Sequence, residues 1–292
     1  MNLHRTDLAV EATQLLRQTE PATISGVTQT ERTAEGYPII EVNVTTPEGA
    51  EAIGKPQGRY LTLELDAILR REPDAFPRAV RALSQELSAL LPGGAEANSA
   101  ALVVGLGNRL VTPDAVGPRA VDQTMVTRHL ISQSPEQFAP FRPVSALAAG
   151  VLGTTGVESG ELVKALSEQI RPDFVIAIDA LAARSVHRLC STVQIADTGI
   201  IPGSGVGNAR QALNRETLGI PVIAVGVPTV VDAATLVSDL TGQTPEQGLG
   251  SMLVTPKDID VLVSDVAKVI GYGINLALQD GLTVEDVDLF LS

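Results

Sequence analysis

The sequence predicts an α/β fold in which helices cover both faces of a doubly wound, mostly parallel sheet, making three layers. Predicted strands and helices alternate from residue 100 onwards, and this order is typical of parallel strands joined by crossover helices. The predicted strands at 100–105 and 174–178 are apolar throughout, as expected for strands covered on both faces. Because no linker interrupts the 292 residues, we expect one domain with an N-terminal elaboration.

The first hundred residues predict that elaboration. Apolar residues recur at near-helical spacing between Leu8 and Leu16, and Asp7 is placed to cap this first helix. A turn-rich stretch with room for one helical turn separates two apolar runs. The elements expected after the first helix are strands at 38–44 and 59–65, an amphipathic helix at 75–91 and a loop at 92–99.

The rest of the chain predicts alternating strands and helices. The helix at 112–131 is expected to begin with Thr112 as its cap, Pro113 as its first residue and Asp114 in its first turn. The expected strands are 100–105, 143–147, 174–178, 192–195 and 222–226, and the expected helices are 112–131, 158–169, 180–189, about 231–240 and 256–279.

Composition excludes several classes of function. With 21 Lys+Arg against 34 Asp+Glu, the net charge is −13, which repels nucleic-acid phosphates and favours a basic partner. The single Cys190 excludes a disulfide framework and a cysteine-based zinc site, and it suits a reducing compartment. The weakly polar stretches 144–157 and 220–231 are shorter than the roughly 18 residues of a membrane span. We therefore expect an intracellular protein that binds neither nucleic acid nor membrane.

Two aspartates follow predicted strands and are the first candidates for catalysis. Asp114 comes after the strand at 100–105, and Asp179 directly ends the strand at 174–178. Ligands of open α/β sheets bind beyond the carboxyl ends of strands, so both carboxylates could face one crevice. Two carboxylates in a poorly solvated site retain one proton between them, which gives an acid and a base for hydrolysis. The alternative is that each aspartate only caps a helix.

Two glycine clusters are candidates for contact with an extended ligand. Gly105, Gly107 and Asn108 follow a strand, and their backbone N–H groups could hold a developing oxyanion. Gly203 and Gly205 follow a proline in a predicted loop. The first cluster lacks the third glycine of the G-x-G-x-x-G motif and the second lies in a loop, so both are weak nucleotide sites.

The remaining nucleophiles and bases lack partners in the sequence. His129 lies late in a predicted helix, and His187 lies eight residues past Asp179. Ser204 has no evident His–Asp partners, and Cys190 is expected to be buried. Asp232 is expected to cap the helix that follows it.

Five long blocks of the sequence resemble the germination (spore) protease family, which degrades small acid-soluble spore proteins. They are VVGLGNRLVTPDAVGPRAV (103–121), RPVSALAAGVLGTTGVESGEL (142–162), RPDFVIAIDALAARS (171–185), ADTGIIPGSGVGNAR (196–210) and TLGIPVIAVGVPTVVDA (217–233). The resemblance implies a phosphorylase/hydrolase-like fold shared with hydrogenase-maturation proteases. It also implies catalysis by Asp114 and Asp179, no cofactor, a homotetramer, and a location in the cytoplasm of the spore core.

The resemblance further implies a zymogen that removes its own leader. Substrates of the family are cut after the first Glu of a motif like Thr-Glu-(Phe/Ile)-Ala-Ser-Glu, and residues 6–11 read Thr-Asp-Leu-Ala-Val-Glu. We therefore expect self-cleavage between Asp7 and Leu8, with a leader at 1–7 and a protease domain at 8–292. The alternative is that these residues are only a capped helix start. The leader and the stretch 234–253 are shorter than is usual in the family.

Two other mechanisms remain open at this point. Hydrogenase-maturation proteases bind a divalent ion with two carboxylates and a histidine. The strand and turn that follow the second candidate aspartate here, STVQIADTGIIP (191–202), offer Asp197 but no histidine. Two carboxylates alone are a weak zinc site, so no metal is expected. The other alternative is a non-catalytic α/β binding protein whose aspartates cap helices.

Overall fold

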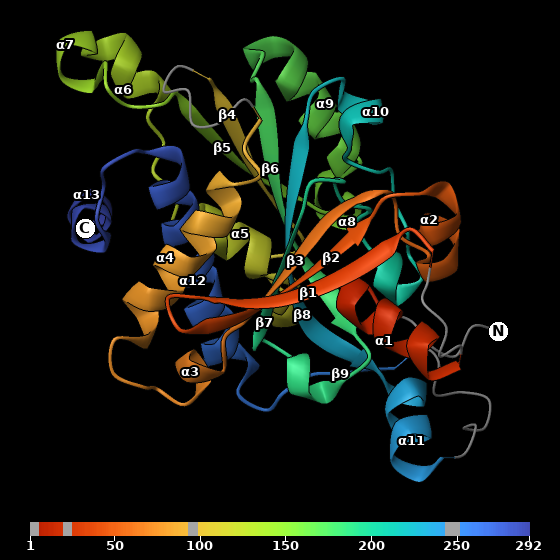
Figure 1. The fold of residues 1–292 in the computed structure, drawn as a ribbon. Coiled ribbons are helices and arrows are strands. Elements are labelled where there is room, and N and C mark those ends of the chain that lie inside the picture. Colours follow the sequence, from red (N-terminus) through yellow and green to blue (C-terminus); the bar gives the residue numbers. More distant parts are fainter. Residues whose placement is uncertain (1–5, 20–24, 93–98, 243–251) are drawn as a thin grey trace.

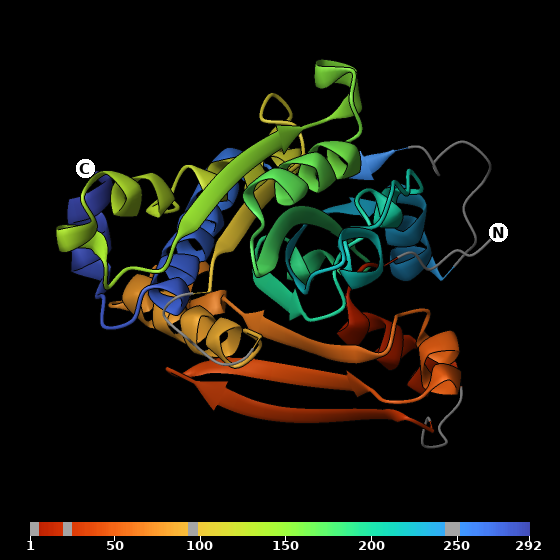
Figure 2. The same ribbon diagram turned by 90° about the horizontal axis from the view of Figure 1, so that it is seen from above.

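A computed structural model of the chain describes residues 6–19, 25–92, 99–242 and 252–292. In these residues one sheet lies between two layers of helices, as Figures 1 and 2 show. The strand order is β1-β2-β3-β7-β8-β6-β4-β5, and β9 pairs with β8. The predicted α/β class is confirmed.

The centre of the sheet is parallel, as predicted. It consists of β5 (Val144–Gly150), β4 (Ala101–Leu106), β6 (Phe174–Ala183) and β8 (Val222–Asp232). Alternate residues of β6 point to opposite faces of the sheet. Ile176 packs in the cluster under α4 and α12, whereas Val175 packs in the cluster under α9. The strands are apolar throughout because helices cover both of their faces.

Antiparallel strands extend the sheet on the β8 side and form most of the N-terminal elaboration. They are β7 (Thr192–Ala196), β3 (Gly58–Glu64), β2 (Tyr37–Val44) and β1 (Val27–Ala34), with the short β9 (Leu253–Val254) on β8. The edge strand β1 was not predicted, because its sequence VTQTERTA is polar and most of its side chains are exposed.

One layer of helices contains the longest apolar helix of the chain. α12 (Ile259–Leu278) packs with α4 (Ala75–Ser88) and α5 (Val116–Val121) over the sheet, and α13 (Val284–Leu291) lies against α12. α12 is long and apolar enough to cross a membrane, which was not expected from the sequence, but two thirds of that stretch (67%) is buried inside the protein. Its apolarity is therefore explained by its place in the core.

The opposite layer covers the face that carries the candidate site. It includes α9 (Ser159–Ile170) over the parallel strands and α1 (Ala9–Thr19) with α2 (Pro47–Ile53) over the antiparallel ones. The other helices are α3 (Asp66–Leu69), α6 (Arg128–Gln133), α7 (Pro135–Phe138), α8 (Leu152–Thr155), α10 (Arg215–Leu218) and α11 (Ala233–Thr241). Most of the predicted loop at 92–99 and part of the stretch 234–253 lie outside the described residues.

Two helix predictions were wrong. The segment 112–131 divides into a 3₁₀ turn η1 (Thr112–Asp114), α5 and the start of α6, and the Thr112 hydroxyl donates to Asp260 on α12 instead of capping a helix. The segment 180–189 continues β6 to Ala183 and then forms the 3₁₀ turn η2 (Val186–Arg188). β6 continues because it pairs with β8 and because Leu181 packs against the N-terminal segment.

Candidate active site

Asp179 lies within β6, not at its end as the sequence suggested. It pairs in register with Gly226 of the neighbouring parallel strand β8. Only 5% of the residue is exposed, and the N–H of Ala180 donates to its Oδ1 at 2.9 Å. The side chain is thus held in the sheet face beneath the α9 layer.

Asp114 is placed by the turn that follows β4. Its Oδ2 accepts a hydrogen bond from the backbone N–H of Asn108 at 2.8 Å. Gly107 has φ +104, and a Cβ at that position would clash with the backbone of Asp114. A residue with a side chain does not fit there, so glycine is what allows the turn to fold back on the aspartate.

The two aspartates line one cavity of about 570 Å³. Burial raises the pKa of Asp179 well above its usual value, and the neighbouring charge of Asp114 raises it further. Burial also raises the pKa of Asp114, while the hydrogen bond from Asn108 opposes that rise. The pair is therefore unequal, and Asp179 is the carboxyl that holds its proton more strongly.

Four of the five predicted ligand-contact residues line this cavity. They are Gly107, Asn108, Gly203 and Gly205. Gly105 does not line it: a Cβ there would clash with the backbone of Gly117, so this glycine allows α5 to approach β4 closely. The N–H of Asn108 is already engaged by Asp114, which leaves it poorly placed to bind an oxyanion.

Asp7 lines the same cavity, although 107 residues separate it from Asp114. Its N–H donates to the Ala182 carbonyl oxygen and its Oδ2 accepts from the Ala182 N–H, both at 2.9 Å. The Ser204 hydroxyl donates to its Oδ1 at 2.7 Å. Asp7 therefore binds β6 and does not cap α1, contrary to expectation.

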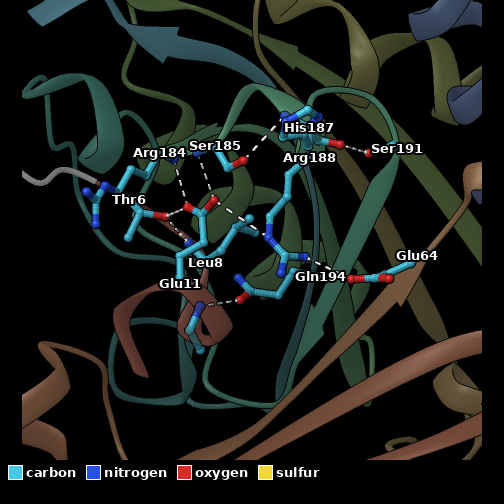
Figure 3. Close-up of polar contacts among 11 residues, drawn as sticks. Thr6, Leu8, Glu11, Glu64, Arg184, Ser185, His187, Arg188, Ser191 and Gln194 are labelled. Atoms are coloured by element: carbon cyan, nitrogen blue, oxygen red, sulfur yellow. Dashed lines mark hydrogen bonds and ion pairs between the residues drawn. The ribbon is translucent and has the colours of Figure 1, made fainter. Parts of the chain in front are cut away.

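The other residues of the N-terminal segment (residues 6–11) contact the region of β6 and β7, as Figure 3 shows for Thr6, Leu8 and Glu11. Leu8 is fully buried, and Gln194 bonds the backbone on both sides of it. The Glu11 carboxylate accepts from the N–H groups of Arg184 and Ser185 at 2.7 and 3.0 Å, and it lies 3.6 Å from the Arg188 guanidinium. Thr6 also donates to Glu11.

Sequence reasoning missed the partners of this segment. Lys55 Nζ donates to the Thr6 carbonyl oxygen at 3.3 Å, and burial lowers the pKa of Lys55 while the charges of Asp7 and Glu11 oppose that fall. Such contacts join residues far apart in the chain. One signal was present for Gln194, because it is an amide residue between Val193 and Ile195 in the fully buried strand TVQIA.

The remaining candidates lie outside the site. His129 and His187 are exposed, and burial raises the pKa of Cys190 to about 12. Asp197 accepts from the Arg59 N–H at 2.8 Å. Asp232 caps α11 through the Thr235 N–H, as predicted. In the part of the chain that the structure describes, no group of three or more His, Cys, Asp or Glu side chains is arranged to hold a metal ion.

Comparison with known proteins gives a family for this chain. The family model of the germination protease matches residues 3–243. A germination protease from Caldanaerobacter subterraneus subsp. tengcongensis is 43% identical and is aligned over 98% of both chains. Germination proteases from Clostridium perfringens (42% identical, 99% of both chains) and Halalkalibacterium halodurans (39% identical, 98% of this chain and 96% of that protein) are similar as well.

Among solved structures, a [NiFe] hydrogenase maturation protease HycI from Thermococcus kodakarensis KOD1 aligns with a TM-score of 0.40 and 17% identity. The alignment covers 67% of this chain and 99% of that one. The family assignment rests on the sequence matches, which extend over nearly the whole chain. The chain belongs to the germination protease family and is an endopeptidase.

Proposed function

We propose that Asp114 and Asp179 hydrolyse a peptide bond with a water molecule held between them. Asp114, whose charged form is favoured by the Asn108 N–H, takes a proton from the water as its oxygen attacks the carbonyl carbon. Asp179, whose burial favours the protonated form, donates its proton to the leaving nitrogen as the C–N bond breaks. The proton on Asp114 then returns to Asp179, because the pair titrates as a unit.

The first substrate in this proposal is the chain itself. Cleavage between Asp7 and Leu8 would release residues 1–7 as a leader and leave 8–292 as the protease domain. The observation that carries the proposal is that Asp7 lines the cavity of both aspartates. This is the residue that the cleavage motif selects, and its backbone is bonded to the strand that carries Asp179.

The second substrate class is the small acid-soluble spore proteins, whose degradation the enzyme would initiate in the cytoplasm of the spore core during germination. The contacts of the N-terminal segment support this proposal, because they bind one acidic residue on each side of the peptide bond between Asp7 and Leu8. A substrate with the same spacing would place its second acid where Glu11 meets Arg188 and two backbone N–H groups. The net charge of −13 also disfavours binding to the spore DNA.

The proposal includes assembly into a homotetramer. Several large apolar side chains are exposed, among them Leu110 at 86% and Met252 at 56%. Contact between copies would remove such side chains from water. Light scattering should then give a particle mass four times that of one chain, and the mass of a monomer would contradict the assembly.

A metal-dependent mechanism is the alternative. Family membership already argues against a purely non-catalytic role. Activity that survives treatment with a strong chelator would favour the aspartate pair, whereas loss of activity that is restored by a divalent ion would favour a metal.

The aspartate pair is tested with a small acid-soluble spore protein as the substrate. The wild-type chain should cut it on the carboxyl side of an acidic residue, as mapped by mass spectrometry. Asp114→Asn and Asp179→Asn should each lower the rate by about 10,000-fold or more, because each removes one half of the proton transfer. The matched control, Asp280→Asn, changes an exposed carboxyl at the end of α12. Activity in either site variant close to that of the control would refute the pair.

A further inference from the structure

Gln194 is a buried amide in the middle of the sheet, on the same face as Asp179. It is only 8% exposed and lies in β7 among apolar residues. In register it pairs with Gly226 of β8, and Gly226 pairs on its other side with Asp179 of β6. The three residues form one row across three adjacent strands, so the Cα atoms of Gln194 and Asp179 are roughly 10 Å apart.

The N-terminal segment crosses the sheet near this row, and the Leu181 side chain fills the space over Gly226. Gly226 lines a second cavity, of about 670 Å³, together with Gln194, and Asp7 lines both this cavity and that of the two aspartates. Asp7 is bonded to β6 on one side of the row. Ala9 is bonded to β7 on the other side. The peptide bond between Asp7 and Leu8 therefore lies between the strand of Asp179 and the strand of Gln194.

Both ends of the Gln194 amide contact this peptide. Its Oε1 accepts from the Ala9 N–H at 2.8 Å, and its Nε2 donates to the Asp7 carbonyl oxygen at 3.2 Å. The first contact orients the amide so that its donor faces the carbonyl oxygen. That carbonyl belongs to the bond whose cleavage is proposed above, and this inference rests on that proposal.

We propose that Gln194 is a catalytic residue that binds the oxyanion formed when water attacks the scissile carbonyl. As the water oxygen bonds to the carbonyl carbon, the π electrons move to the carbonyl oxygen, and the hydrogen bond from Nε2 strengthens with the developing negative charge. When the C–N bond breaks, these electrons return to form the product carboxyl group. The donor comes from β7 and Asp179 comes from β6, on the two sides of β8.

The inference is tested with Gln194→Glu and Gln194→Met in the full chain. Gln194→Glu retains an acceptor for the Ala9 N–H but loses the donor, and Gln194→Met has neither. Both should slow the appearance of the chain that begins at Leu8 by about 100-fold to 1000-fold, which is the effect of removing one oxyanion donor. The matched control is Thr62→Val. Thr62 lies in β3 directly opposite Gln194 of β7, and the buried hydroxyl of Thr62 has no hydrogen-bond partner in the described structure.

A second measurement separates catalysis from structural support. A synthetic peptide with the sequence of residues 4–14 is offered to the processed enzyme, and kcat and KM are measured separately. A role in binding the oxyanion predicts that kcat falls by about 100-fold or more while KM changes little. A kcat within about threefold of the control, whether or not KM rises, would overturn the inference. If the wild type cuts neither itself nor the peptide, the proposed function fails instead.

Discussion

The pKa values of Asp114 and Asp179 are raised to different extents because the surroundings of the two carboxyl groups differ. Asp179 is buried in the sheet and lies near the negative charge of Asp114, and both effects raise its pKa well above the usual value. Asp114 is less deeply buried and accepts the N–H of Asn108, which opposes the rise in its pKa. In the proposed mechanism this difference makes Asp179 the acid and Asp114 the base.

The raised pKa of Asp179 predicts a dependence of stability on pH. Between the ordinary pKa of the unfolded chain and the raised pKa, the folded protein holds more protons, so the free energy of unfolding falls as pH rises through this window. Asp179→Asn removes the buried charge. The variant should therefore be more stable than the uncut parent at pH 7, by about 1.4 kcal/mol for each tenfold difference in proton affinity of Asp179 between the folded and the unfolded chain.

Urea unfolding between pH 4 and pH 7 checks this, with Gln194→Met present in both chains to slow self-cleavage and intact mass measured to confirm that the parent is uncut. The stability difference between the variant and the parent should grow with pH. A difference that stays constant across the range would contradict the assignment. Asp280→Asn, at an exposed position, is the matched control.

At the scale of elements, the position of Asp114 depends on the close packing of α5 on β4. Gly105 and Gly117 face each other, and a Cβ on either would clash with the backbone of the other element. The same contact explains why the predicted helix at 112–131 does not form as one piece. The chain leaves β4, turns at Gly107, forms η1 and only then enters α5.

Gly117→Ala should disturb this packing. The added Cβ would clash with backbone atoms of Leu106 and Ile178, and backbone cannot move aside as a flexible side chain does. We expect a loss of about 1–3 kcal/mol of stability and a fall in activity of about tenfold or more as Asp114 shifts. Thermal unfolding and peptide cleavage measure the two effects. Gly153→Ala, whose Cβ would meet no atom within 4 Å, should lose no stability, and an equal loss in both variants would contradict the account.

Periodicity predicted most elements but failed where tertiary contacts decide. Residues 180–189 show apolar spacing that suits a helix, yet Leu181 and Ala183 pack with Leu8 as part of a strand. The polar β1 forms because β2 offers it a complete antiparallel partner. For residues 180–189 the deciding contact is with Leu8, far away in the sequence. β1 pairs with the next strand along the chain, with Ala34 opposite Tyr37, but its polar sequence gave no apolar pattern to predict it.

At the scale of the whole molecule, the N-terminal elaboration contributes to the candidate site. Asp179 comes from β6 and Asp114 from the turn after β4, and both were predictable because each is an acidic residue directly next to, or shortly after, an apolar run of sequence. The antiparallel half supplies Gln194 on β7, and the loop before β3 supplies Lys55. Their roles emerge only when residues 6–11 return to the centre of the sheet, a contact that spans up to 197 residues of sequence.

Because the N-terminal segment is already bound to β6 and β7 of its own chain, self-cleavage should be intramolecular. The most direct measurement follows the intact mass and the N-terminal sequence of the full chain at mildly acidic pH over a range of dilutions. The account predicts loss of residues 1–7, a new terminus at Leu8, a first-order rate that dilution does not change, and no cleavage in Asp179→Asn. An N-terminus that stays at Met1, a cut at another bond, or an Asp179→Asn chain that is cut as fast as the wild type would contradict it.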